Sequence, residues 1–202
     1  MRKLFELDSP VMSGLNRMGD WIIFSILSLL CAFPIITIGA AQVGLYTAMD
    51  RLQQTKVCGV KDYFVILLQN IKQSTVLWIV VLLEVLLCGF GIWFYAVKEA
   101  GSLTLIMIVL GVISLMAGIW IFPLQAKYSN SICRVLKNAL LCTLLYPIRS
   151  FLLVCIHAIP LVVFVFSPDL FLYMSVLWIL FWPALMANIS LRVLKKPFSQ
   201  LS

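Results

Sequence analysis

Five long apolar runs constrain this chain more than any other feature of its sequence. A helix needs ~20 mostly apolar residues to cross the ~30 Å hydrocarbon core of a bilayer, and a soluble domain cannot bury several such stretches. Of the residues, 63% are hydrophobic and only 11% are charged, against about half and about a quarter in soluble domains. We therefore predict an all-α, polytopic transmembrane helix bundle that forms one integral membrane domain over residues 1–202. The predicted spans are residues 21–38, 76–97, 103–124, 150–166 and 170–191.

The basic residues predict the orientation of these spans. Lys and Arg collect in loops on the cytoplasmic side of membrane proteins. Residues 39–75 and 125–149 each contain four of them, and three more follow the fifth run. By contrast, Lys98 stands alone in the turn after the second run, and the turn at 167–169 contains none. We expect the connectors 39–75 and 125–149 and the C-terminus to be cytoplasmic. With five crossings, the N-terminus then lies outside.

The N-terminal charges leave one alternative open. Arg2, Lys3 and Arg17 precede the first run, and their number favours a cytoplasmic N-terminus. In the alternative arrangement, the first run enters the membrane and returns at Pro34 and Gly39. The chain then makes four full crossings, and both termini are cytoplasmic.

Three aromatic–proline pairs suggest an internal repeat. The pairs are Phe33–Pro34, Phe122–Pro123 and Trp182–Pro183, and they lie near the ends of the first, third and fifth runs. Equivalent ends would make the chain two copies of a span–connector–span unit followed by a fifth span. Chance similarity is the alternative in a sequence so rich in Leu and Ile.

The two connectors contain amphipathic segments at residues 60–73 and 131–144. In both, apolar residues recur at helical spacing, with basic and amide side chains on the opposite face. Such a helix can rest on anionic lipid, where each basic residue contributes ~1 kcal/mol. It can also be a docking surface for a cytoplasmic partner, so the sequence supports two interpretations of these segments.

A stripe of small residues lies between these elements. Ala40, Gly44 and Ala48 stand four residues apart, a spacing that lets another helix approach closely. We therefore predict a helix-packing face here, with another part of the same chain as the default neighbour.

Two ionisable residues lie inside predicted spans. Glu84 is near the middle of the second run and His157 is midway along the fourth. Intramembrane ionisable groups are functional candidates, because placing them in hydrocarbon is costly. One hypothesis is that Glu84 and His157 form a polar pair that serves a proton or cation pathway. The simpler alternative is a single interhelical hydrogen bond.

Other signatures of chemistry are absent from the sequence. The six cysteines include no Cys-x-x-Cys pair, and the single histidine has no nearby ligand cluster. There is also no P-loop, no nucleophile elbow and no glycine-rich dinucleotide turn. We predict a protein that is not an enzyme, with no catalytic residues, cofactor or metal. The net charge of +7 belongs to loops beside the membrane, so we expect no nucleic-acid partner.

Several segments resemble the YesL-like family of small bacterial membrane proteins. The resemblance extends over nearly the whole chain and is most specific in its N-terminal third. It rests on residues 16–20 (Asn-Arg-Met-Gly-Asp), 33–41 (Phe-Pro-Ile-Ile-Thr-Ile-Gly-Ala-Ala), 45–46, 63–64, 69–74, 128–131 and 136–139.

This resemblance implies a function without specifying a reaction, because the family has no established activity. Its members are commonly encoded beside sugar importers of the ABC type. We therefore expect a multi-pass accessory protein of the bacterial cytoplasmic membrane that contacts the lipid bilayer and the membrane subunits of an oligosaccharide ABC importer. The alternative is a small stand-alone transporter or channel that uses Glu84 and His157.

Overall fold

A computed structural model describes residues 10–54, 57–128 and 130–198. Throughout this part of the chain the regular elements are helices, so the predicted all-helical class is confirmed there. The elements are α1 (Pro10–Ala32), the 3-10 helix η2 (Ile35–Thr37), α2 (Ile38–Gln54), α3 (Val60–Val97), α4 (Gly101–Lys127), α5 (Ile132–Leu145), α6 (Pro147–Phe166), α7 (Pro168–Tyr173), α8 (Ser175–Leu180) and α9 (Trp182–Phe198).

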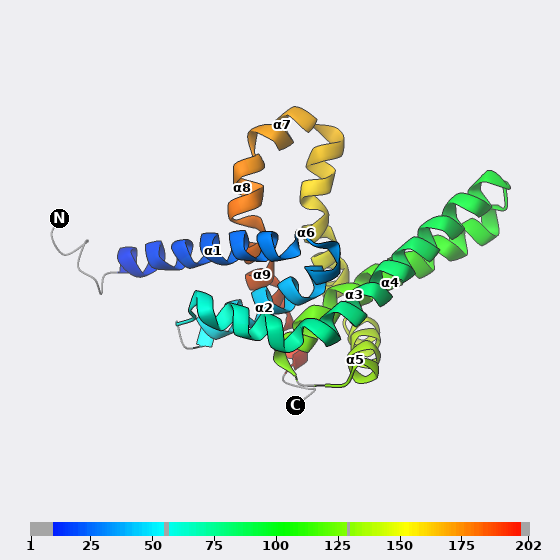
Figure 1. Cartoon of the computed structure of the whole chain (residues 1–202). Coiled ribbons are helices and arrows are strands. Elements are labelled where there is room, and N and C mark those ends of the chain that lie inside the picture. Colours follow the sequence, from blue (N-terminus) through cyan, green and yellow to red (C-terminus); the bar gives the residue numbers. More distant parts are fainter. Residues whose placement is uncertain (1–9, 55–56, 129, 199–202) are drawn as a thin grey trace.

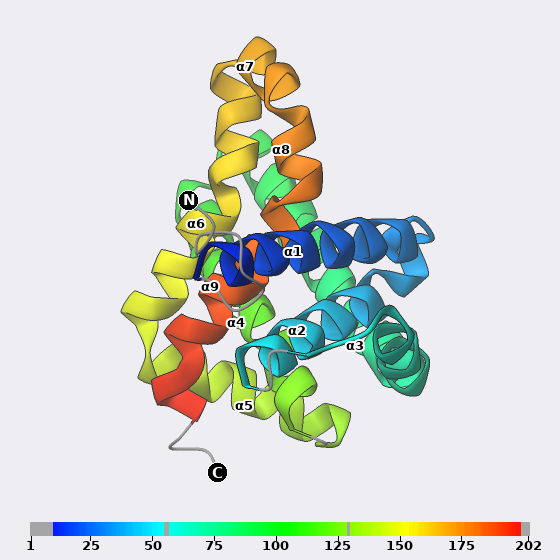
Figure 2. The ribbon, with the colours of Figure 1, turned by 90° about the vertical axis from the view of Figure 1, so that its left-hand side faces the viewer.

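Two helical hairpins project from a common base (Figure 1). Helices α3 and α4 form the first, and α6 and α8 form the second, with α7 across its tip. The base consists of α2, α5, α9 and the adjoining ends of the longer helices, and α1 lies across it (Figure 2). The turn between α3 and α4 places Glu99 at a φ of 54°, in the left-handed region. This conformation lets the chain reverse within a few residues.

Among the described helices, α3, α4 and α6 are long and apolar enough to cross a membrane. The outer parts of these helices are exposed, since no residue of α3 beyond Leu77 is buried and the buried residues of α4 begin at Met116. Apolar surface on this scale would drive association in water, whereas lipid solvates it. These features are typical of a membrane-embedded protein.

Three of the predicted spans lie within single helices. Residues 76–97 fall in α3, 103–124 in α4 and 150–166 in α6. Helix α3 is longer than predicted, because the amphipathic segment 60–73 and the apolar run that follows it form one continuous helix.

The predicted span 21–38 is not one helix. Helix α1 ends at Ala32, and the chain bends at Phe33 and Pro34 before η2 and α2 begin. Proline has no N–H to donate and disfavours the helical conformation in the residue before it, so a helix commonly ends there. The Thr37 hydroxyl donates to the Pro34 carbonyl over 2.8 Å and tightens the bend. Helix α2 then returns and packs against α1.

The predicted span 170–191 is also interrupted. It is divided among α7, α8 and α9, with breaks at Met174 and Phe181. Pro183 explains the second break, because it cannot donate the hydrogen bond that would continue the helix from α8. The break at Met174 has no comparable signal in the sequence.

The prediction that the aromatic–proline pairs are equivalent ends is wrong. Phe33–Pro34 lies in the bend after α1, Phe122–Pro123 lies inside α4, and Trp182–Pro183 lies at the start of α9. A proline can be accommodated within a helix or can end one, and the tertiary surroundings decide which. Similar dipeptides therefore occupy different structural positions here.

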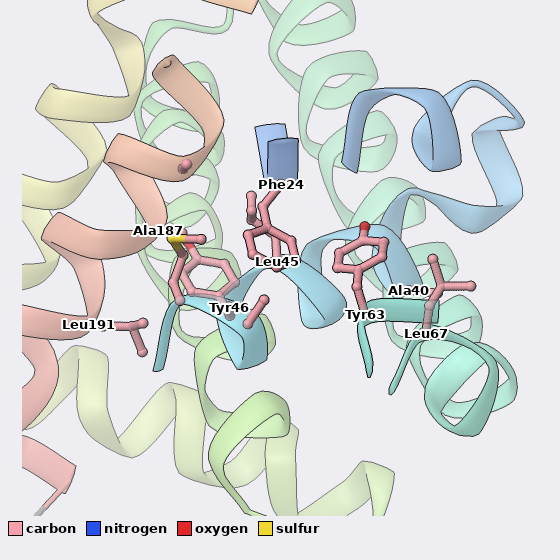
Figure 3. Close-up of a cluster of buried hydrophobic side chains, with 11 residues drawn as sticks. Phe24, Ala40, Leu45, Tyr46, Tyr63, Leu67, Ala187 and Leu191 are labelled. Atoms are coloured by element: carbon pink, nitrogen blue, oxygen red, sulfur yellow. The ribbon is translucent and has the colours of Figure 1, made fainter. Parts of the chain in front are cut away.

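Two clusters of buried apolar side chains hold the base together. In the first, residues of α1, α3 and α9 meet around α2 (Figure 3). The second surrounds Trp120 of α4, which is fully buried against side chains of α3, α5, α6 and α9. The Trp120 indole Nε1 donates to Ser150 Oγ over 2.7 Å, so its polar atom is satisfied inside the cluster.

Candidate functional site: a polar cavity between α1, α2 and α9

A cavity of about 300 Å³ lies between α1, α2 and α9. Its lining combines charged, amide and apolar side chains, whereas three further cavities lie along the apolar α3–α4 hairpin. The lining residues are Arg17, Asp20, Trp21, Met49, Leu52, Gln53, Asn188 and Arg192.

The helical repeat explains how three helices supply this lining. On α1, Asp20 and Trp21 follow Arg17 by three and four residues, so all of them share one face. On α2 and α9 the same spacing joins Met49 to Gln53 and Asn188 to Arg192. Each helix therefore presents a short stripe of lining residues to the cavity.

A buried hydrogen bond fixes α9 against α1 beside this cavity. The Ala184 backbone N–H donates to Ser25 Oγ over 3.2 Å. Ala184 lies in the first turn of α9, where backbone N–H groups have no partner within the helix. Phe24 of α1 packs in the same cluster as Ala187 and Leu191 of α9 (Figure 3). These contacts form an apolar layer that holds the lining of the cavity in place.

Two amides span the cavity wall from different helices. Gln53 Nε2 of α2 donates to Asn188 Oδ1 of α9 over 3.1 Å. Asn188 is 7% exposed, and the other amide atom of Gln53, Oε1, is buried and has no hydrogen-bond partner among the described residues. Leaving a buried acceptor unpaired costs about 1–3 kcal/mol. This acceptor lies behind the cavity wall, where solvent does not reach it.

The charges around the cavity are unbalanced. Arg17 and Arg192 contribute two guanidinium groups, and Asp20 contributes one carboxyl. Both arginines are exposed, so the cavity can be reached from the surface at their side. Partial burial raises the pKa of the Asp20 carboxyl. The net positive charge favours an anion.

The predicted helix-packing residues lie on α2. Ala40, Gly44 and Ala48 are all buried there. A side chain at Gly44 would place its Cβ 3.0 Å from Tyr63 Cε2 of α3, and the Tyr63 hydroxyl donates to the Ala41 carbonyl over 3.2 Å. The neighbour at Gly44 is therefore α3 of the same chain.

Gly39 makes a closer approach, although it lies outside the predicted stripe. A Cβ at this position would collide with the Ser74 carbonyl oxygen and would lie 2.9 Å from Trp78 Cβ. The backbone of α2 touches α3 here, and only glycine leaves the necessary space.

The structure does not bring Glu84 and His157 together. The Glu84 carboxylate on α3 accepts a hydrogen bond from Ser114 Oγ on α4 over 2.7 Å. His157 Nδ1 lies 2.8 Å from the Leu153 carbonyl oxygen on its own helix, α6. The proposed proton or cation pathway required these side chains to form a pair, and they have separate partners instead.

Sequence reasoning missed the cavity as a site. Gln53 lies in a polar connector and Asn188 in an apolar run, and neither position alone indicates a binding site. The available signal was the i, i+4 spacing of Asn188 and Arg192, together with the i, i+3 spacing of Arg17 and Asp20. Joining these signals requires knowing that α1, α2 and α9 meet.

Comparisons with known proteins add no relative: no family model, curated protein or solved structure matches this chain. Within the described residues, no group of His, Cys, Asp and Glu side chains is arranged to hold a metal ion. Fold and site together define the class as a membrane-embedded helical protein with a polar cavity beside α1, α2 and α9.

Proposed function

We propose that this chain is a non-enzymatic, multi-pass accessory protein that binds the membrane subunits of a bacterial carbohydrate ABC importer. The resemblance to the YesL-like family supports the carbohydrate part of this proposal. The observation that carries the membrane-partner part is the position of Glu84, an ionisable residue on an exposed face of the α3–α4 hairpin.

Glu84 favours a partner because its own chain covers it poorly. A charged side chain at the centre of a spanning helix costs about 2.5–3.5 kcal/mol. Ser114 supplies one hydrogen bond, and the hairpin projects away from the base and from the α6–α8 hairpin (Figure 1). A transmembrane helix that brings a hydrogen-bond donor to this depth would satisfy the carboxyl. An importer subunit with such a helix is the proposed partner.

The helices that line the cavity support a topology of four membrane crossings instead of five. Arg17 in the first half of α1 and Arg192 in the second half of α9 line the same cavity, so these halves of the two helices lie at the same level. The basic residues favour a cytoplasmic C-terminus, which makes the N-terminus cytoplasmic too. The crossings are then α3, α4, α6 and the α8–α9 segment, while α1 and α2 form a hairpin that does not cross.

Site-specific photocrosslinking tests the proposed partner face. Leu87 lies one turn from Glu84 on the same side of α3, whereas Leu86 points to the opposite side, and their exposures are 70% and 58%. A photoreactive phenylalanine in place of Leu87 should crosslink to an importer membrane subunit at native expression levels. The same group in place of Leu86 is the matched control and should give lipid adducts.

Purification in mild detergent provides a second readout. Importer subunits should accompany the unmodified chain, and Glu84→Leu should reduce their recovery while Leu86→Ala should not. A chain recovered alone, with importer subunits present in the same membranes and no crosslink from position 87, would overturn the proposal.

A further inference from the structure

We propose that the cavity between α1, α2 and α9 binds a phosphorylated polyol, a phosphate ester whose neighbouring carbons carry hydroxyl groups. The inference rests on the chemistry of the cavity and does not depend on the importer proposal.

The two arginines account for the phosphate. Arg17 and Arg192 reach the cavity from different helices, and no ion pair within the described residues occupies either guanidinium. A guanidinium offers paired N–H donors that match phosphate oxygens, and such charge-assisted hydrogen bonds are about twice as strong as neutral ones. The two guanidinium groups outnumber the single Asp20 carboxyl. The excess positive charge favours the binding of one anionic group.

The remaining charged group of the lining accounts for the hydroxyl groups. The Asp20 carboxylate is an acceptor in the same lining, on the face of α1 that also carries Arg17. A phosphate with no donor groups would leave this carboxylate without a hydrogen bond from the ligand. A hydroxyl group beside the phosphate would donate to it, and hydrogen bonds to a charged acceptor are about twice as strong as neutral ones.

The apolar side chains and the size complete the argument. Trp21, Met49 and Leu52 give the cavity an apolar wall, which suits the C–H groups of a polyol. A volume of about 300 Å³ is at the lower end for small-molecule sites. It matches a phosphate with a short polyol, such as glycerol 3-phosphate, a soluble sugar phosphate or the headgroup of phosphatidylglycerol.

Binding to the purified full-length chain in a non-ionic detergent tests this inference. The calorimetric probes are glycerol 3-phosphate, propyl phosphate and inorganic phosphate. We expect glycerol 3-phosphate to bind at least severalfold more tightly than propyl phosphate, which lacks the hydroxyl groups. Arg17→Gln and Arg192→Gln should each weaken binding about tenfold or more, the loss expected for one charged hydrogen bond. Arg134→Gln on the exposed side of α5 is the matched control and should bind as the unmodified chain does.

Two further measurements complete the experiment. Unfolding midpoints of the Arg17→Gln and Arg192→Gln chains should equal that of the parent, since both side chains are exposed. In nanodiscs, phosphatidylglycerol that competes with glycerol 3-phosphate would identify a lipid headgroup as the source, and absence of competition would identify a soluble ester. Equal affinity for propyl phosphate and glycerol 3-phosphate would overturn the polyol assignment. Binding unaffected by either arginine substitution, or no saturable binding of any probe, would overturn the site.

Discussion

The Tyr63 ring of α3 occupies the space where a side chain at Gly44 of α2 would stand, and its hydroxyl bonds to the neighbouring Ala41 carbonyl. Tyr63 is fully buried (Figure 3). This contact joins the α1–α2 hairpin to α3, so the base depends on small residues in α2.

Alanine substitutions of three glycines should distinguish two effects on stability. One is the cost of a clash at a close helix–helix contact, and the other is the gain from the higher helix propensity of alanine. Gly39→Ala should cost about 2 kcal/mol or more, because the added Cβ meets the Ser74 backbone, which cannot move aside as a side chain can. Gly44→Ala should cost about 1 kcal/mol, because the Tyr63 ring must shift by a few tenths of an ångström.

Gly89→Ala is the control for this series, since no atom lies within 4 Å of its added Cβ. It should leave stability unchanged or slightly raised. Thermal unfolding in mild detergent measures all three variants. Equal midpoints for Gly39→Ala and Gly89→Ala would show that α2 does not pack against α3 in this way.

A buried amide between α3 and α4 provides the next prediction. Gln125 Nε2 donates to Ser74 Oγ over 2.9 Å, and both side chains are buried. Ser74→Ala removes the acceptor and should destabilise the protein by about 1–3 kcal/mol. Ser74→Thr keeps a hydroxyl and should retain more stability, as judged by unfolding in detergent. Equal loss in both variants would assign the effect to packing instead of the hydrogen bond.

Two cysteines of α5 should differ in reactivity. Burial raises the pKa of the Cys142 thiol to about 11, whereas Cys133 is exposed. The thiolate is the reactive form, so at pH 8 Cys142 remains protonated and becomes a thiolate only as the pH rises towards 11. The comparison uses two chains, each of which retains only one of these cysteines. At pH 8, maleimide should label Cys133 faster than Cys142.

Labelling after denaturation in SDS is the control for this comparison and should modify both cysteines. Rapid labelling of Cys142 in the folded chain at pH 8 would contradict the packing of α5 against α4.

The sequence predicts the three helices that contain a long apolar run. The apolar runs in α3, α4 and α6 are long enough to predict spanning helices, although Pro123 and Pro160 lie inside two of them. The bend at Pro34 and the break at Phe181 depend on whether a proline is tolerated, and Pro123 inside α4 shows that it can be.

The cavity was beyond prediction for a related reason. Its lining comes from residues more than 130 positions apart, as the hydrogen bond between Gln53 and Asn188 illustrates. Helical spacing places Asn188 and Arg192 on one face, but it does not say which helix they meet. The hypothesis that Glu84 and His157 form a pair fails for the same reason, because each lies in a different hairpin. The hydrogen bond between Glu84 on α3 and Ser114 on α4 is instead an interhelical one, as the simpler alternative predicts.

Cysteine accessibility in intact cells tests the membrane arrangement most directly. In a chain whose native cysteines are replaced, single cysteines are introduced by Asn16→Cys, Glu99→Cys and Asp169→Cys, all at exposed positions. A membrane-impermeant maleimide should label positions 99 and 169, at the tips of the two hairpins, from outside. It should label position 16 only after the membrane is permeabilised. Labelling of position 16 in intact cells, or protection of position 99 or 169, would contradict four crossings with both termini in the cytoplasm.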